Sequence, residues 1–400
     1  MADRPTADTR MLVLNRDLVR TGAGTFWLTA EGREISLGPS MATLGYQFAI
    51  PTTVAAVVDG TGMDSSVLTE AVTRLEDLGV LVTHNPAGRA VTGTGGLFQS
   101  PLLSVAEALA GGTSDVVVFG VPYDVGASHR PGSRFGPDYL RRVSGSLFQY
   151  RPEAGSPTGM WDPVRGRQVL SGVRLADLGD IDVGSVLTRN AEAFDVTEQL
   201  TSRITGAGRF PVMLGGDHSV ALAAIRGVLR TYPRLGVIHI DAHADYAGPR
   251  RDDWRQDCHH GNFMGWVVGD ARVERVVQFG IRQLTATDTE PSPKVTRWSG
   301  RSAARVPIDE VLADLPEDLP YYVTVDVDGL DPAFIPATGT PLPGGFTHTE
   351  AVALLEGLCA ARRVVGMDLV ELIADSSDQS GLVAADIVLR TIDAATAGCG

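Results

Sequence analysis

Residues 236–245 read GVIHIDAHAD, an apolar run that ends in two acidic residues and a histidine at alternate positions. The β-branched residues of this run favour a strand. Because successive strand side chains point to opposite faces, the spacing of two places Asp241, His243 and Asp245 on one face. Carboxylates and an imidazole at one strand end are a typical ligand set for a divalent metal ion. The stretch therefore predicts a strand that ends in part of a metal site.

Two other fragments have the same form, an apolar run followed by acidic or histidine side chains. Residues 215–219 read GGDHS and residues 326–328 read DVD, so Asp326 and Asp328 share one side of the chain. Four carboxylates and two imidazoles that converge without a cation would repel one another strongly, so divalent ions are expected between them. Two ions fit this number of ligands better than one.

Short apolar runs recur after residue 115, and helical patterns separate several of them. Such alternation predicts an α/β domain with a parallel sheet that helices cover on both faces. Ligands of such sheets bind beyond the carboxyl ends of the strands, where the acidic fragments lie. The expected strands are residues 115–121, 210–214, 236–240, 275–281, 321–327 and 363–370.

Composition limits the class of partner. The 400 residues carry a formal net charge of -14, which disfavours a broad nucleic-acid or anionic-membrane surface and suits a cationic ligand. We find no uncharged apolar stretch of eighteen residues and no signal-peptide pattern, so we expect a cytoplasmic protein. Three scattered cysteines exclude a disulfide framework.

A longer motif gives the chain a family resemblance. Residues 324–345, TVDVDGLDPAFIPATGTPLPGG, and the segment RPGSRFGP at residues 130–137 resemble the ureohydrolases, which include arginase and agmatinase. The resemblance implies a three-layer α/β/α ureohydrolase fold over residues 113–400, two Mn²⁺ ions per subunit, and a homo-oligomer, often a trimer or hexamer. Carboxylate and imidazole ligands also suit Mn²⁺, although Fe²⁺, Co²⁺ and Zn²⁺ are alternatives.

The resemblance also assigns the ligands. Asp241 and Asp326 would bridge the two ions, with a hydroxide between the ions as the nucleophile. One ion would be bound by His218, Asp241, Asp245 and Asp326, and the other by His243, Asp241, Asp326 and Asp328. Asp217 is better explained as a carboxylate that orients the neighbouring His218 than as a ligand.

Three residues are predicted to act in catalysis. Glu371 matches the family glutamate that pairs with the guanidinium group of the substrate. His260 matches a histidine that transfers a proton to the leaving amine, and we prefer it to His259 because a glycine follows it. Asp245 is assigned a catalytic role in addition to metal binding.

Departures from the family pattern bear on the substrate. Ala247 and Gln256 replace the Asn and Ser with which arginases hold the amino-acid end of arginine, and no proline follows Glu371. We therefore predict that the enzyme releases urea and an amine from a guanidino compound or a peptide-linked arginine rather than from free arginine. The alternatives are an agmatinase or guanidino-acid hydrolase of primary metabolism, a zinc deacylase of related fold, and an inactive scaffold or regulator.

The first part of the chain has its own pattern. A hairpin at residues 25–37, helices at 52–58 and 66–78 and a strand at 80–83 resemble a small winged-helix-like α+β domain over residues 1–90, followed by a linker at 91–112. Residues 1–100 contain seven Arg and no Lys against ten acidic residues, which disfavours DNA binding. Peptide recognition and a structural or oligomerisation role remain as alternatives.

Overall fold

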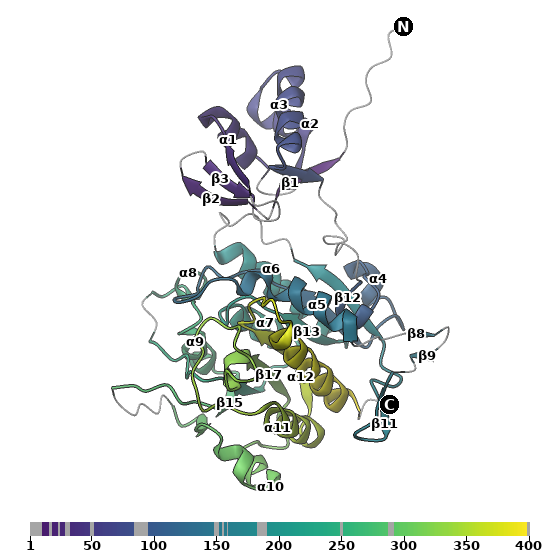
Figure 1. Cartoon of the computed structure of the whole chain (residues 1–400), viewed down its shortest axis with the longest axis vertical. Coiled ribbons are helices and arrows are strands. Elements are labelled where there is room, and N and C mark those ends of the chain that lie inside the picture. Colours follow the sequence, from purple (N-terminus) through teal and green to yellow (C-terminus); the bar gives the residue numbers. More distant parts are fainter. Residues whose placement is uncertain are drawn as a thin grey trace. The chain divides into compact units, whose positions relative to one another are not determined.

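The structure, a computed structural model, consists of two compact units, and each is described by itself (Figure 1). The smaller unit is formed mainly by the first 89 residues, and the larger by most of the remainder. The structure describes residues 10–15, 18–22, 25–28, 33–48, 52–83, 95–147, 152–153, 156–157, 159–181, 190–248, 251–286 and 292–397.

An eight-stranded parallel sheet forms the centre of the larger unit, with the strand order β12-β7-β13-β18-β17-β14-β15-β16. The six strands expected from the apolar runs are all present. The two edge strands, β12 and β16, were not expected, because their sequences mix apolar with polar residues. The strands are β7 (Val116–Gly120), β12 (Leu175–Asp180), β13 (Phe210–Leu214), β14 (Leu235–Ile240), β15 (Val273–Phe279), β16 (Val295–Trp298), β17 (Tyr321–Asp326) and β18 (Val364–Val370).

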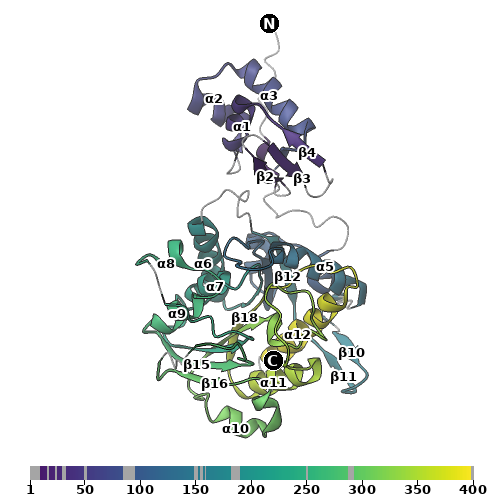
Figure 2. The same ribbon diagram turned by 60° about the vertical axis from the view of Figure 1, so that its left-hand side comes forward.

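Helices form two layers on this sheet (Figure 2). A helix that connects two parallel strands does so by a right-handed crossover. Connections that run one way along the sheet therefore place their helices on one face, and connections that run the other way place them on the opposite face. On one face α12 packs against both α5 and α11, and on the other α7 packs against α9. The helices are α5 (Gly136–Leu147), α6 (Asn190–Gly206), α7 (Val220–Val228), α8 (Trp254–Asp257), α9 (Phe263–Gly269), α10 (Ile308–Leu312), α11 (His348–Ala361) and α12 (Gln379–Thr396).

The central strands are buried throughout, as expected of a parallel sheet with both faces covered. This rigid core holds the loops at the carboxyl ends of the strands, which confirms the predicted α/β/α fold. Short elements complete the larger unit: β8 (Pro152–Glu153), β9 (Ser156–Pro157), β10 (Met160–Asp162), β11 (Arg167–Val169), and the 3₁₀ turns η2 (Ser133–Phe135), η3 (Ser302–Arg305) and η4 (Val327–Gly329).

Residues 95–112 differ from the predicted linker over residues 91–112, of which 91–94 lie outside the described residues. They contain η1 (Leu97–Gln99) and α4 (Val105–Leu109), and the side chains of Leu97 and Phe98 are fully buried in the core of the larger unit. The backbone N–H of Leu97 donates to Asp177 Oδ2 at 2.8 Å. Glycines and threonines suggested a linker, but two apolar side chains anchor this segment to the larger unit.

In its described residues the smaller unit is α+β, with two small antiparallel sheets and three helices. The predicted hairpin is confirmed by β3 and β4, although its turn residues 31–32 lie outside the described residues. Leu68, Val72 and Leu75 of α3 are buried, whereas Val67 of the same helix is 56% exposed. The elements are β1 (Met11–Leu14), β2 (Leu18–Gly22), β3 (Thr25–Leu28), β4 (Arg33–Ser36), α1 (Pro39–Tyr46), β5 (Thr52–Thr53), α2 (Val54–Thr61), α3 (Ser65–Asp77) and β6 (Leu81–Thr83).

None of the helices in the described ranges is both long and apolar enough to span a lipid bilayer.

Candidate metal centre

The predicted ligands lie together at the carboxyl ends of adjacent central strands. β14 leads to Asp241, His243 and Asp245, β17 ends at Asp326, and the loop after β13 carries His218. Gly216 allows this loop to approach β7, because a Cβ atom there would lie 1.5 Å from the carbonyl oxygen of Tyr123. The strand order thus brings residues more than a hundred positions apart into one cluster.

The imidazole of His218 faces three carboxylates. Its Nδ1 lies 3.0 Å from an oxygen of Asp241, 3.3 Å from Asp326 and 3.4 Å from Asp245. This buried nitrogen forms no acceptable hydrogen bond with any residue that the structure describes. A nitrogen surrounded by carboxylate oxygens is satisfied either by a proton on an imidazolium or by a shared cation.

The partners of the other ring nitrogen fix which nitrogen faces the carboxylates. His218 Nε2 lies 2.8 Å from Thr324 Oγ1, and the Thr324 hydroxyl donates to Asp368 at 2.7 Å. With its only proton given to Asp368, Thr324 accepts from His218 Nε2–H. Nδ1 is therefore the nitrogen that faces the carboxylates, and a metal ion bound there would be held by the Nδ1 lone pair of a neutral imidazole.

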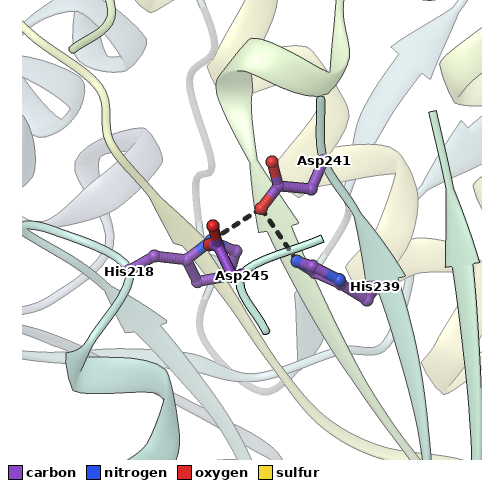
Figure 3. A group of neighbouring side chains, drawn as sticks. All are labelled: His218, His239, Asp241 and Asp245. Atoms are coloured by element: carbon purple, nitrogen blue, oxygen red, sulfur yellow. Dashed lines mark hydrogen bonds and ion pairs between the residues drawn. The ribbon is translucent and has the colours of Figure 1, made fainter. Parts of the chain in front are cut away.

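Asp241 connects two groups of candidate ligands. Its Oδ2 belongs to the group around His218, which Figure 3 shows with His239 and Asp245, and their ligand atoms lie within 4.8 Å of one another. Its Oδ1 lies 3.4 Å from His243 Nδ1, which is 3.1 Å from Asp328 Oδ2. The two oxygens of one carboxylate therefore face two different ligand groups.

The electrostatics of the cluster show uncompensated negative charge. Burial and the Asp241 carboxylate raise the pKa of Asp245 to about 7, and burial with Asp328 and Asp241 raises the pKa of Asp326 well above its usual range. Burial lowers the pKa of His243, but contacts with Asp241 and Asp328 outweigh it and raise this pKa to about 11. Divalent cations would relieve this repulsion.

Glu371 and His260 contact each other beside the cluster. Glu371 has a left-handed backbone, with φ of 63°, and its buried Oε1 accepts from the backbone N–H of His218 at 3.0 Å. His260 Nδ1 lies 3.3 Å from the same oxygen, while His260 Nε2 accepts from the backbone N–H of Ser128 at 3.1 Å. Burial lowers the pKa of His260, but Glu371 and nearby carboxylates raise it above its usual value.

His259 and Asp217, the sequence neighbours of His260 and His218, have different contacts from those two residues. His259 Nδ1 accepts from the backbone N–H of Gly261 at 3.2 Å. The carboxylate of Asp217 accepts from the backbone N–H groups of Gly126 and Ser219 rather than from the ring of His218. The expectation that Asp217 orients His218 is therefore wrong in detail, because consecutive side chains diverge and Thr324 holds the ring instead.

The structure adds two residues that the sequence interpretation did not single out, His239 and Thr324. Both are buried polar residues within apolar strands, and each contacts a candidate ligand: His239 Nε2 lies 2.8 Å from Asp241 Oδ2. The spacing of two between His239 and Asp241 was a usable signal, because it places both on one face of β14.

Described residues after Asp245 make defined contacts within the larger unit. Trp254 packs against Phe194 with ring centroids 5.4 Å apart, and the guanidinium of Arg226 lies 5.0 Å from its ring. Gln256 Nε2 donates to Asp253 at 3.1 Å, and the backbone N–H of Ala247 donates to Gly261 at 3.0 Å. Gln256 is thus engaged inside its own loop.

The turn after Glu371 is fixed without a proline. Asp375 accepts from Tyr139 Oη at 3.0 Å and from the backbone N–H of Ser380 near the start of α12. The backbone N–H of Ile373 donates to Ala337 at 3.0 Å, which joins the turn to the loop after β17. Side-chain hydrogen bonds therefore hold the turn that carries Glu371.

Known proteins share this fold and sequence. The model of the Arginase family matches residues 114–393. An agmatinase of Bacillus anthracis is 35% identical over 279 residues, which cover 69% of this chain and 90% of that protein. A guanidinobutyrase of Pseudomonas aeruginosa is 30% identical over a region that covers 70% of this chain and 85% of that protein. The structure of proclavaminate amidino hydrolase from Streptomyces clavuligerus aligns with a TM-score of 0.60 and 30% identity, and the alignment covers 70% of this chain and 91% of that chain.

The family match, residues 114–393, includes the whole parallel sheet and the cluster of carboxylates and imidazoles. Fold and sequence agree over this region. The chain therefore belongs to the arginase family.

Proposed function

We propose that this protein is a binuclear manganese amidinohydrolase that converts a guanidino group to urea and an amine. As a member of the arginase family, the chain is a hydrolase of carbon–nitrogen bonds in linear amidines. The observation that carries the two-ion proposal is Asp241, whose two oxygens face separate groups of ligands. A bridging carboxylate requires that arrangement.

The residues that would hold the two ions come from three strand ends. His218 and Asp245 would hold one ion and His243 and Asp328 the other, and Asp241 and Asp326 are assigned to both. When bound, a pair of Mn²⁺ ions would lower the pKa of a water molecule and so supply a hydroxide nucleophile for the guanidinium carbon. Asp326 Oδ2 lies 3.3 Å from His218 Nδ1, which supports its place in the first group.

Glu371 binds and aims the substrate. Its buried carboxylate faces the cluster, and a guanidinium is a planar cation that pairs well with a carboxylate. The left-handed backbone of Glu371 supports a functional position, because such conformations cost about 1–3 kcal/mol and persist where surrounding structure enforces them.

His260 holds the proton that the leaving amine requires. Its contact with Glu371 places the imidazole beside the guanidinium that Glu371 binds. Because Nε2 accepts from the backbone N–H of Ser128, the ring proton lies on Nδ1 beside Glu371, where the nearby carboxylates raise the pKa of the ring. His260, Glu371 and the shared ligand Asp245 form the proposed catalytic set.

The proposed substrate is a guanidino compound or a peptide-linked arginine rather than free arginine. The amide nitrogen of Gln256, in α8, donates to Asp253 at the start of the same helix. Ser128, which contacts His260, is exposed and can meet the far end of a longer substrate. The relatives named agmatinase and guanidinobutyrase support a small guanidino compound, and the additional α+β unit supports a peptide.

The test is urea release from agmatine, guanidino acids, free arginine and arginine peptides by the full-length protein loaded with Mn²⁺. Glu371→Gln should reduce kcat/KM by about a hundredfold, because loss of a buried charge pair costs about 3 kcal/mol. The matched control is Glu356→Gln, since Glu356 is a surface partner of Arg165. Equal activity of Glu371→Gln and the wild type would refute the assignment.

A further inference from the structure

One row of the central sheet, directly beside the cluster, is polar across five adjacent strands. The backbone register pairs Asp368 of β18 with Thr324 of β17, Thr324 with His239 of β14, His239 with Gln278 of β15, and Gln278 with Arg297 of β16. Register partners share a face of the sheet. We name these five residues the cross-strand row.

One arm of the row ends on Asp241, and its hydrogen bonds have a fixed direction. Arg297 Nε–H can only donate, and it donates to Gln278 Oε1 at 2.8 Å. The Gln278 amide nitrogen must therefore donate to His239 Nδ1, 3.0 Å away. His239 is thereby neutral, and its Nε2–H donates to Asp241 Oδ2 at 2.8 Å.

The other arm ends on His218. Thr324 donates to Asp368, so its oxygen accepts from His218 Nε2–H, and His218 Nδ1 is the nitrogen that faces the carboxylates. The ring of Phe263 stacks on the His218 ring with centroids 4.2 Å apart and meets the edge of the His239 ring at 5.7 Å. Packing therefore restrains the same rings that the hydrogen bonds orient.

We propose that the cross-strand row is a positioning device that directs the lone pairs of His218 Nδ1 and Asp241 Oδ2 at one cation position. The two atoms lie 3.0 Å apart, and the two arms fix them as the atoms of His218 and Asp241 that face each other. The inference rests on the proposed metal function and adds roles for His239, Gln278 and Thr324 outside the ligand set.

This proposal separates His239 from the ligands that surround it. His239 lies within ligand distance of the His218 group, but Nδ1 accepts from Gln278 and Nε2 donates to Asp241, so both ring nitrogens are used. A ligand would need a free lone pair. His239 is thus a positioning residue that acts through Asp241.

The first test compares Mn²⁺ titration calorimetry of the full-length, metal-depleted protein and its variants. His239→Phe should weaken Mn²⁺ binding about 10-fold to 100-fold, the effect typical of lost outer-shell hydrogen bonds. His239→Gln should restore binding to within a few-fold, because an amide can still donate to Asp241. The control is His348→Phe, which removes a histidine that contacts Asp386 at 2.8 Å between α11 and α12.

The second test uses the other arm and guards against misfolding of a buried His239 variant. Thr324→Val keeps shape but loses the hydroxyl, and it should weaken Mn²⁺ binding and broaden the electron paramagnetic resonance signal of the bound ions. Thr324→Ser should rescue both properties. The control is Thr391→Val, a buried threonine whose hydroxyl donates to its own helix.

Each result is decisive for one claim. Wild-type Mn²⁺ affinity in both His239→Phe and Thr324→Val would overturn the positioning role, and so would a lost ion in His239→Gln, which would make His239 a ligand. Failure of the wild type to bind Mn²⁺ would instead refute the proposed function on which the inference rests.

Discussion

The orientation of single donor atoms decides the chemistry of the site. The sequence alone places four carboxylates and two imidazoles together, but it does not state which nitrogen faces them. In the structure, Thr324 takes one nitrogen of His218 and leaves the other among carboxylates 3.0–3.4 Å away. Such an arrangement is stable only with positive charge between the groups.

His260 and His259 are adjacent in sequence but differ in their contacts, which gives a residue-level prediction. His260→Asn should lower kcat by about 100-fold or more, because general acid catalysis contributes roughly that factor, and it should leave Mn²⁺ bound. The alkaline limb of the pH profile, where a proton donor with a raised pKa becomes deprotonated, should disappear in this variant.

The measurement is steady-state urea release from pH 6 to pH 10 with metal content determined in parallel. His259→Asn is the matched control. A severe loss in that variant, with normal turnover by His260→Asn, would exchange the two assignments.

Sequence patterns predicted the central elements well and the peripheral ones poorly. A strand such as β18 is apolar throughout because both faces are covered, and this signal is strong. β16, at the sheet edge, contains Thr296 and Arg297, and its pattern resembles that of a loop. His239 and Thr324 escaped notice because a polar residue inside an apolar run gives no sign of which partner satisfies it.

The start of α11 gives a prediction at the level of one element. Glu350 closes a capping box with Thr347 and pairs with Arg301. Its bond with Arg301, followed by bonds with Thr347, lowers the pKa of Glu350 from 4.5 to about 2. A carboxylate whose pKa is lower in the folded than in the unfolded protein stabilises the fold at pH values above the unfolded pKa. The stabilisation by Glu350 is therefore complete above about pH 4.5 and is lost as the pH falls toward 2.

Thermal unfolding of the wild type and Glu350→Gln measures this contribution. The difference in Tm should be constant from pH 7 to pH 5 and should narrow below pH 4.5. Glu317→Gln, at a residue that is largely exposed, is a suitable control. A difference that grows with acidity would contradict the capping argument.

The boundary between the two units is a property of the whole molecule. Because Leu97 and Phe98 lie in the core of the larger unit, a fragment that begins at residue 90 should fold and bind Mn²⁺. A fragment that begins at residue 105 should lose about 5 kcal/mol or more from missing core contacts, a large part of a typical domain's stability. Denaturant unfolding of both fragments tests this boundary, and equal stability would restore the linker interpretation.

The same fragment separates the alternatives for the smaller unit. If that unit binds a peptide, the fragment from residue 90 should keep its kcat/KM for a small guanidino compound and show a raised KM for an arginine peptide, since remote contacts supply binding energy. If kcat/KM fell equally for the small guanidino compound and the arginine peptide, the result would favour a structural role for the smaller unit.

The most direct measurement is urea release as a function of Mn²⁺ added to the metal-depleted full-length protein, with bound metal counted in each sample. We predict that activity on at least one guanidino substrate rises until two ions are bound per chain and then stays constant. A plateau at one ion, or no urea at any metal content with every substrate tested, would contradict a binuclear amidinohydrolase.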